Sequence, residues 1–253
     1  MNQAQRVAEI SQRRYYAATA DRYDADHVHP HDAHFVALSH MSGLASGLEL
    51  TSVLDVGSGT GRAAVYLKRR HPQMQVIGLE PVIDLLRNSD RSVGANFVCG
   101  SGSSLPFPDD SFDAVCATGL LHHVPVPSIV VNEMTRVARR VVMISDANRF
   151  GQGRPVARLA KLAISRLGFW PIYMTIRTGG KGYQYSEGDG IFYSYSIYDS
   201  APTLDKWADR TFIIPTSTCL RGGYKPLLSA PGALLVAIRD QPPVASALPV
   251  KMG

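Results

Sequence analysis

The sequence predicts an α/β fold in which a mostly parallel sheet is covered by helices on both faces. Short, nearly all-apolar segments alternate with helical segments, which is typical of a sheet buried on both sides. A glycine-rich turn follows the first apolar segment, where such folds pass from strand to helix. The 253 residues suit one domain with additions, and 45% hydrophobic residues provide a large core without metals or disulfides.

Seven segments have the length and apolar composition of strands. They lie at residues 51–56, 75–80, 96–99, 112–117, 140–145, 211–214 and 234–238. Between the first five segments, the spacing of apolar residues predicts helices at 62–70, 82–88 and 128–138. This order of elements predicts the sheet and both of its helical layers.

The segments on either side of the first five strands are less regular. Helical spacing at residues 3–20 and 35–44, separated by a polar stretch, predicts an N-terminal helical lid over residues 1–50. The main domain is then expected over 51–240, with helices at 155–167 and 201–208. Within it, residues 171–200 are rich in Gly and Tyr and predict an insertion that caps the acceptor pocket, with Tyr193-Ser194-Tyr195 alternating as in a strand. The proline-containing residues 241–253 are expected to be a loose tail.

The cysteines and the absence of targeting signals favour the cytoplasm. Cys99, Cys116 and Cys219 form no C-x-x-C pair, and two of them lie in predicted strands, so buried reduced thiols are expected. The start at Met1 lacks a charged and then apolar leader. No apolar run reaches the ~18 residues that a membrane span needs.

The net charge of +5 is unevenly distributed. Residues 136–181 contain ten Lys and Arg residues and a single acid, Asp146. Either this region is a solvated face, or it attracts an anionic substrate or membrane surface. In particular, basic and apolar residues alternate along 155–170. This pattern suits either a helix that covers the sheet or a helix that rests on anionic lipid.

A glycine-rich turn follows the first strand and predicts a ligand site. In Asp55-Val56-Gly57-Ser58-Gly59-Thr60-Gly61, the glycines permit a sharp bend and a close approach of backbone N–H groups to a ligand. The next helix presents its positive N-terminus there. Glu80 ends the following strand, where a carboxylate can accept hydrogen bonds from both hydroxyls of a ribose.

The spacing of this turn separates two classes of cofactor. The dinucleotide fingerprint G-x-G-x-x-G ends in a glycine where this sequence has Arg62. Asp55 stands two residues before the first glycine, which is unfavourable beside a pyrophosphate. A carboxylate there suits the ammonium group of a zwitterionic amino acid.

Three ordered segments carry a resemblance to a known family. Residues 55–61, 105–113 (LPFPDDSFD) and 120–124 (LLHHV) resemble the corresponding segments of class I S-adenosylmethionine-dependent methyltransferases, of the ubiquinone/menaquinone-biosynthesis or type 11 subgroup. The resemblance covers roughly residues 15–146. It implies a Rossmann-like fold with a mostly parallel seven-stranded sheet and S-adenosylmethionine as the cofactor.

The resemblance also implies roles for residues at matching positions. Gly57 and Gly59, on either side of Ser58, would contact the methionine moiety, while Asp55 would face its amino group directly or through water. The other implied contacts are Glu80 with the ribose, Pro81 and Val82 with the adenine, Thr118 and Leu120 with the methionine end, and Tyr16 or Tyr23 closing over that end. The family usually has an acid after Gly100, but this sequence has Ser101 followed by Gly102. A serine hydroxyl can still accept the adenine's hydrogen bond, and a backbone contact is the alternative.

Candidates for catalysis lie on the acceptor side, because methyl transfer mainly requires alignment and sometimes a base. His122 and His123 follow the fourth strand, at the edge where α/β proteins bind ligands, although one of them can be purely structural. His29, in the histidine-rich polar stretch, is a second candidate base, and Tyr193 in the predicted cap is a third. A metal site among His27, His29 and His31 is conceivable but is not expected.

The resemblance and the composition together predict an enzyme. We expect methyl transfer from S-adenosylmethionine to a small-molecule acceptor, with oxygen preferred over nitrogen or carbon, and an anionic acceptor would suit the basic region at 136–181. Methylation of a lipid or quinone at a membrane and a regulatory module that binds the cofactor without methyl transfer are the alternatives. No nucleic-acid partner is expected, because neither an N-P-P-Y motif nor a basic, aromatic extension is present. A homodimer is possible.

Overall fold

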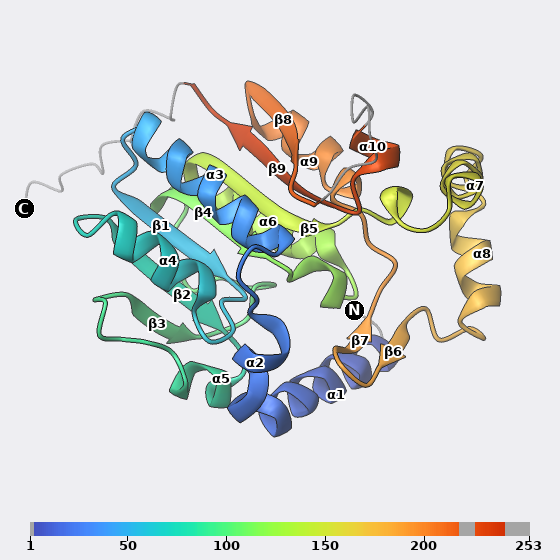
Figure 1. The fold of residues 1–253 in the computed structure, drawn as a ribbon, viewed down its shortest axis with the longest axis horizontal. Coiled ribbons are helices and arrows are strands. Elements are labelled where there is room, and N and C mark those ends of the chain that lie inside the picture. The colour runs from blue at the N-terminus through green and yellow to red at the C-terminus, as the bar shows by residue number, and fades with distance from the viewer. Residues whose placement is uncertain (1–2, 218–225, 241–253) are drawn as a thin grey trace, which may run out of the picture.

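The computed structural model describes residues 3–217 and 226–240. The predicted tail at 241–253 and Cys219 lie outside these residues. Figure 1 shows one central twisted sheet with helices on both sides, and an arm of two helices extending from one end. No helix in the described ranges is long and apolar enough to cross a membrane.

The central sheet confirms the predicted class of fold. Its strands, in spatial order, are β3 (Asn96–Cys99), β2 (Gln75–Glu80), β1 (Ser52–Val56), β4 (Phe112–Thr118), β5 (Ala138–Ala147), β9 (Gly232–Ile238) and β8 (Arg210–Pro215). The first five strands are parallel, and β9 is antiparallel to both neighbours, β5 and β8. Because the parallel strands all end at one edge, the loops that follow β1, β2 and β4 meet there.

Two separate hydrophobic cores cover the two faces of this sheet. On one face, α3 (Ala33–Gly47) and α4 (Arg62–Arg70) bury side chains such as Leu38 and Leu67 against β1, β4 and β9. On the other face, α6 (Pro127–Val137) and α9 (Ala201–Trp207) do the same with residues such as Met134 and Leu204. Helix α5 (Ile83–Arg87) follows β2 and completes the βα units.

The N-terminal helices divide between a lid and the core. Helix α1 (Gln3–Thr19) contacts α5 and β7, and Figure 1 shows it beyond the end of the sheet. A 3₁₀ turn at Ala20–Arg22 and α2 (Tyr23–His27) continue from it. Helix α3 instead packs on the sheet, since Ala37, Leu38 and Met41 are fully buried. The lid-like part of the predicted region 1–50 is therefore its first half.

The segment after β5 is where the structure departs most from the expectations. It forms a 3₁₀ turn (Arg149–Gly151), α7 (Pro155–Arg166), the unpredicted α8 (Trp170–Arg177), and a hairpin of β6 (Gln184–Ser186) and β7 (Gly190–Phe192). A further 3₁₀ turn (Ile197–Asp199) follows, and α10 (Pro226–Ser229) precedes β9. The predicted strand at Tyr193–Tyr195 is wrong, because the chain leaves the hairpin at Phe192 and the Tyr193 N–H donates to the His122 carbonyl at 2.7 Å.

The two described cysteines differ in burial. Cys116 lies in the centre of β4 and is fully buried, as expected. Cys99 is exposed, contrary to the expectation, because β3 is the edge strand of the sheet. Burial of a strand residue depends on its place in the sheet as well as on the apolar run that contains it.

Candidate functional site

The glycine turn after β1 requires glycine at each of its three positions. Gly57, Gly59 and Gly61 have φ angles of 71°, 56° and 97°, a region that side chains with a Cβ rarely adopt. A Cβ on Gly57 would lie 2.6 Å from the Leu120 side chain, and one on Gly59 would lie 3.1 Å from the Tyr23 hydroxyl. The turn therefore keeps open a space between β1, Tyr23 and Leu120.

The backbone amides of this turn are already bonded within the protein, which differs from the expectation that they face a ligand. The N–H groups of Gly57 and Ser58 both donate to the Leu79 carbonyl, at 2.8 and 3.0 Å. The Gly59 N–H donates to Glu80 Oε2 at 3.1 Å. A ligand beside this turn would therefore pack against the glycine backbone, and the Glu80 carboxylate would accept its hydrogen bonds.

Glu80 lies at the end of β2, directly beside the turn. Its Oε1 accepts the Val82 N–H at 3.0 Å, and its side chain is held between the two loops. Burial raises the pKa of Glu80 to about 7 and outweighs the two backbone hydrogen bonds, which lower it. A carboxylate whose backbone bonds fix both oxygens is well placed to receive hydroxyl donors from the cavity side.

Asp55 has a structural position, and its contact with the amino group of a ligand, direct or through water, stays a prediction. It is fully buried within β1 and lines neither of the two cavities that adjoin the glycine turn. Its Oδ2 accepts the Ala64 N–H at 3.1 Å, in the first turn of α4, and Cys116 Sγ lies 3.8 Å from its Oδ1. Burial raises the pKa of Asp55 to about 7. Asp55 therefore ties the start of α4 to β1 and holds the shape of the glycine turn.

A cavity of about 980 Å³ opens at the carboxyl edge of the sheet and gathers most of the predicted cofactor residues. Those lining it are Tyr16, Tyr23, Gly57, Gly59, Glu80, Pro81, Ser101, Gly102, Thr118 and Leu120. Val82 and Leu85 add an apolar wall. Ser58 lines an adjoining cavity of about 690 Å³, together with both tyrosines and three residues described next, His122, His123 and Asp189.

His122 is oriented by a buried carboxylate at the end of β5. Its Nδ1 donates to Asp146 Oδ1 at 2.7 Å, and the Asp146 side chain is only 1% exposed. Asp146 also accepts the backbone N–H groups of Leu121 and Ala147, at 2.8 and 2.6 Å. Because these bonds fix the ring, His122 directs Nε2 into the adjoining cavity.

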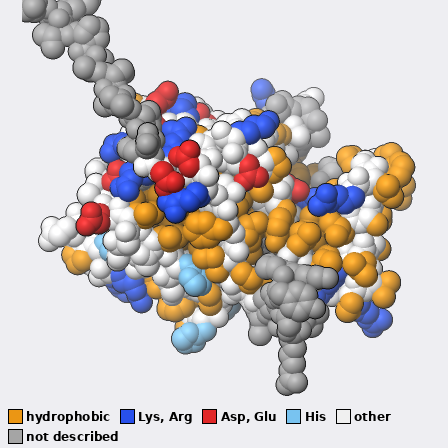
Figure 2. All heavy atoms as spheres, turned by 90° about the horizontal axis from the view of Figure 1, so that it is seen from above, with side chains coloured by type: hydrophobic (Ala, Val, Ile, Leu, Met, Phe, Trp, Pro, Cys, Tyr) orange, Lys and Arg blue, Asp and Glu red, His pale blue; other side chains and the backbone are white. Residues whose placement is uncertain are grey.

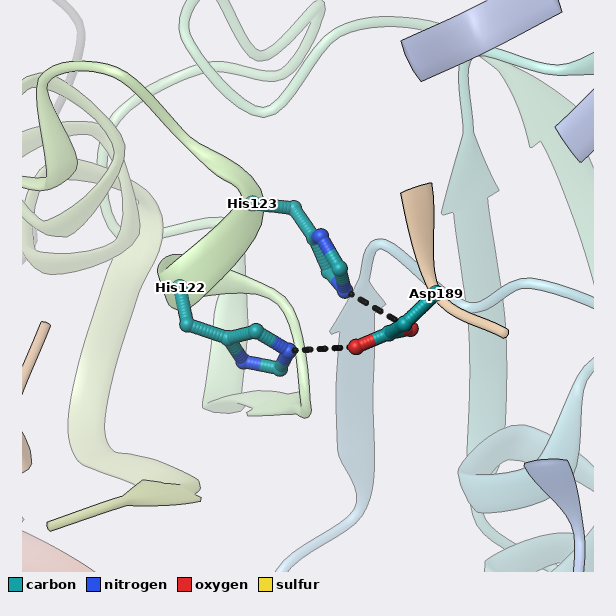
Figure 3. A group of neighbouring side chains, drawn as sticks. All are labelled: His122, His123 and Asp189. Carbon is teal, nitrogen blue, oxygen red and sulfur yellow. Dashed lines mark ion pairs between the residues drawn. The ribbon is translucent and has the colours of Figure 1, made fainter. Parts of the chain in front are cut away.

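Asp189, in the turn between β6 and β7, meets both histidines. Figure 3 shows its two carboxylate oxygens directed at the two rings. Oδ2 lies 3.6 Å from His122 Nε2, and Oδ1 lies 3.3 Å from His123 Nε2. The Tyr16 hydroxyl, which comes from α1, donates to Oδ1 at 3.2 Å. Three segments far apart in the sequence, namely α1, the 3₁₀ turn at Leu121–His123 and the β6–β7 hairpin, thus meet at one carboxylate.

The charges in this group are strongly coupled. Burial would lower the pKa of His122, but the negative charge of Asp146, its hydrogen bond and the nearby Asp189 outweigh burial and raise this pKa to about 10. Burial would likewise raise the pKa of Asp189, but both histidines hold it well below its usual range. His122 is therefore an imidazolium at neutral pH while Asp189 remains beside it.

The other candidate residues are distributed differently from the expectation. His29 is exposed and lines neither of these two cavities; its Nε2 lies 3.2 Å from the Asp26 carbonyl oxygen. Tyr193 lines neither of them, but lines another cavity to which His122 also contributes. His27 and His34, from the same polar region as His29, line the adjoining cavity instead. His27 in α2 and His34 in α3 face this cavity because of the way these two helices run, and the polar composition of the segment gives no sign of it.

Sequence reasoning missed three residues of the site: Asp146, Asp189 and Gln12. Gln12 is 6% exposed on α1 and donates to the Asp189 carbonyl at 3.0 Å, which attaches the lid to the hairpin. Asp146 could have been found, because it ends a predicted strand at the ligand-binding edge. No comparable pattern in the sequence indicated Asp189 or Gln12.

The same group has a spacing that a metal ion could use. The ligand atoms of His122, His123 and Asp189 lie within 4.8 Å of one another. The Tyr16 hydroxyl donates to the Asp189 carboxylate, and both histidine rings lie within ion-pair distance of it, so these contacts alone can hold the group together. We therefore consider the group as an acceptor site.

Comparison with known proteins agrees with this geometry. Residues 54–143 match a family described as a methyltransferase domain. An uncharacterized methyltransferase of Mycobacterium sp. (strain KMS) is 40% identical over 89 residues, which cover 35% of this chain and 34% of that protein. A fatty-acid O-methyltransferase of Mycolicibacterium smegmatis is 34% identical over 107 residues, covering 41% of this chain and 39% of the relative. The matches thus span about a third of the length of the first relatives.

A solved structure has a similar fold over most of its length. It is a SAM-dependent methyltransferase, possible histamine N-methyltransferase, from Thermotoga maritima, with a TM-score of 0.56. The alignment covers 90% of this chain and 99% of that one, at 15% sequence identity. This likeness concerns the fold alone.

Proposed function

We propose that this chain is a class I methyltransferase and that it transfers the methyl group of S-adenosylmethionine to an oxygen atom of a small-molecule acceptor, a proposal that its fold and the match of residues 54–143 support. The observation that carries the proposal is the position of His122. It lies at the carboxyl edge of the sheet, paired with Asp146, and borders the same cavity as Gly57 and Thr118.

The cavity at the glycine turn fits this cofactor. Glu80 presents a buried carboxylate for the two ribose hydroxyls, and Pro81, Val82 and Leu85 form an apolar wall suited to a purine ring. The glycine surfaces of the turn lie where a Cβ would fill the space. When bound, the cofactor supplies an electrophilic methyl group on a sulfonium, and the protein needs only to align the acceptor with it.

The group around Asp189 indicates what kind of acceptor atom would bind. His122 Nε2 and the Tyr16 hydroxyl are both directed at the Asp189 carboxylate, His122 at Oδ2 and Tyr16 at Oδ1. An acceptor carboxylate or phenolate could take the place that Asp189 now takes and receive the same two donors. An amine would arrive as an ammonium ion, and a protonated His122 cannot remove its proton.

In this scheme Asp146 holds His122 in one orientation and stabilises its charge. His122 binds and aligns the acceptor oxygen, and the Tyr16 hydroxyl adds a second donor from the lid. The hairpin of β6 and β7 would move Asp189 aside when the acceptor enters. The negative charge of the acceptor would then replace that of Asp189, so the net charge of the site is preserved.

A tritium-transfer assay tests the proposal. The protein is incubated with S-adenosylmethionine labelled in its methyl group and separate panels of carboxylic acids, phenols and amines. Label is expected in alkali-labile esters or in aryl ethers. His122→Ala should lower the turnover by about 100-fold or more, because alignment and hydrogen bonding are both lost.

His40→Ala is the matched control, because His40 is exposed on α3 and away from the cavities that adjoin Gly57. Its turnover should equal that of the unmodified protein. Label found on nitrogen or carbon would contradict the choice of an oxygen acceptor. S-adenosylhomocysteine binding without transfer to any acceptor class would contradict the enzymatic activity and favour a regulatory module.

A further inference from the structure

The arm that extends from the domain is unusually apolar on its surface. We define the α7–α8 arm as residues 154–181, which comprise α7, α8 and their flanks (Figure 1). Neither of its helices contains a buried residue. Six large apolar side chains are exposed on it: Val156 (80%), Leu159 (57%), Leu167 (68%), Phe169 (56%), Ile172 (59%) and Ile176 (78%). They account for half of the exposed large apolar residues found across 3–217 and 226–240.

The charge on the same arm is entirely positive. Arg154, Arg166, Arg177 and Lys181 are exposed, Arg158 and Lys161 are half-buried, and no Asp or Glu occurs between Asp146 and Glu187. None of these six cations forms an ion pair with an acid in the described part of the chain. Figure 2 shows apolar side chains together with blue basic groups on the lobe that projects at the right. Across residues 3–217 and 226–240, the cations of the arm therefore have no anionic counterpart.

The base of the arm borders a cavity that reaches His122. This cavity, of about 1020 Å³, is lined by Lys161, Trp170 and Met174 from the arm and by His122 and Asp189 from the site. The Trp170 indole nitrogen in its wall is buried without a hydrogen-bond partner. A molecule that enters at the arm can thus approach the imidazole of His122 without crossing the core.

We propose that the α7–α8 arm docks on an anionic lipid bilayer. An apolar surface with surrounding cations matches the interface of such a bilayer, where apolar side chains enter the acyl boundary and cations lie among the headgroups. A second copy of the chain fits less well, because a two-fold contact of the arm with itself would oppose its unpaired cations. The docked arm would place the cavity at its base next to the membrane surface.

Vesicle sedimentation tests this inference without any need for activity. The full-length protein is mixed with vesicles of phosphatidylcholine alone or with about one third phosphatidylglycerol. Binding is expected only to the anionic vesicles and should weaken in high salt. Arg166→Gln with Arg177→Gln should lower the partition coefficient by roughly 30-fold, about fivefold for each cation removed.

A second pair of substitutions, Phe169→Ser with Ile172→Ser, should lower this coefficient by at least about tenfold, because apolar area is lost from the interface. The matched controls are Arg69→Gln with Arg70→Gln on α4, and Ile83→Ser on α5, all at exposed positions remote in sequence from the arm. They should bind as the unmodified protein does. All substituted residues are exposed, so the melting temperature should change little.

Three results would overturn the inference. One is equal binding to neutral and anionic vesicles, or no binding to either. Another is that the double arginine variant and the Phe169→Ser with Ile172→Ser variant both bind anionic vesicles as strongly as the controls do. The third is a stable dimer in light scattering that the Phe169→Ser and Ile172→Ser variant dissociates, which would identify the arm as a contact between copies.

Discussion

Replacing Glu80 by Gln tests the cofactor site most directly. The carboxylate oxygens of Glu80 already accept the N–H groups of Gly59 and Val82, and each retains lone pairs for a ribose hydroxyl. A glutamine keeps one acceptor oxygen and replaces the other by an amino group, which can accept nothing. At least one charge-assisted hydrogen bond to the ribose is then lost, and a backbone N–H of the turn loses its acceptor.

The magnitude follows from the energy of such bonds. Loss of one hydrogen bond to a charged group costs about 2–3 kcal/mol, which corresponds to a roughly 30- to 150-fold weaker affinity. The fold should survive, because glutamine has nearly the same volume and the position lies at the end of β2, next to the cavity.

The affinity should also depend on pH. Burial raises the pKa of Glu80 to about 7, so a growing fraction of the cofactor-free protein carries a protonated Glu80 as the pH falls below this value. If only the ionised form accepts both hydroxyls, the affinity should fall about tenfold between pH 8 and pH 6. The Glu80→Gln variant should show a much flatter profile.

Isothermal titration calorimetry with S-adenosylhomocysteine checks both points, with Glu49→Gln as the matched control at an exposed position after α3. Unchanged affinity in Glu80→Gln would refute the assignment of Glu80 to the ribose. An affinity that is constant from pH 8 to pH 6 would refute the elevated pKa of Glu80.

The other predictions concern turnover, the glycine turn and acid stability. Asp146→Asn should lower turnover by about 100-fold with smaller change in cofactor affinity, because His122 loses its fixed orientation; an unaltered rate in the tritium assay would contradict this. Gly57→Ala should weaken S-adenosylhomocysteine binding by at least about tenfold and lower the stability by roughly 1–3 kcal/mol, because φ is positive and the Cβ meets Leu120. The control Gly43→Ala, where nothing lies within 4 Å, should raise the stability by about 0.5–1 kcal/mol in urea unfolding. Asp113→Asn should destabilise the protein by about 1–3 kcal/mol at neutral pH, since Asp113 accepts bonds from Thr51 and Arg139. Burial would raise the pKa of Asp113, but hydrogen bonds from Thr51 and the charge of Arg139 outweigh burial and lower this pKa. The contribution of Asp113 to the free energy of unfolding is therefore present at neutral pH and is lost as the pH falls through the lowered pKa. A difference in unfolding free energy between the wild type and Asp113→Asn that persists at low pH would contradict this.

Local patterns in the sequence were sufficient for the sheet and for the glycine turn. Each parallel strand is a short apolar run, and all of them except the edge strand β3 are buried by helices whose apolar spacing is equally local. The positions of Gly57, Gly59 and Glu80 follow from these elements, because a strand end determines the edge at which the next side chain emerges. The same reasoning explains why Thr118 and Leu120 line the cavity as expected.

The same patterns gave wrong results where a side chain's neighbours come from distant parts of the chain. Tyr193 was expected in a strand, but its backbone bonds to the His122 carbonyl. His29 lies outside the site, while His27 and His34, which share its polar segment, lie within it.

The sequence by itself determined the class of fold, the edge at which we propose that the cofactor binds and the acid beside the glycine turn, because each depends on residues that are close along the chain. Only the tertiary structure decided the proposed acceptor side. There Asp146 at the end of β5 is hydrogen-bonded to His122 after β4, and Asp189 in the later hairpin lies beside His122 and accepts a hydrogen bond from Tyr16 in α1. Their protonation states arise from burial and mutual charge, and these are properties of the assembled site.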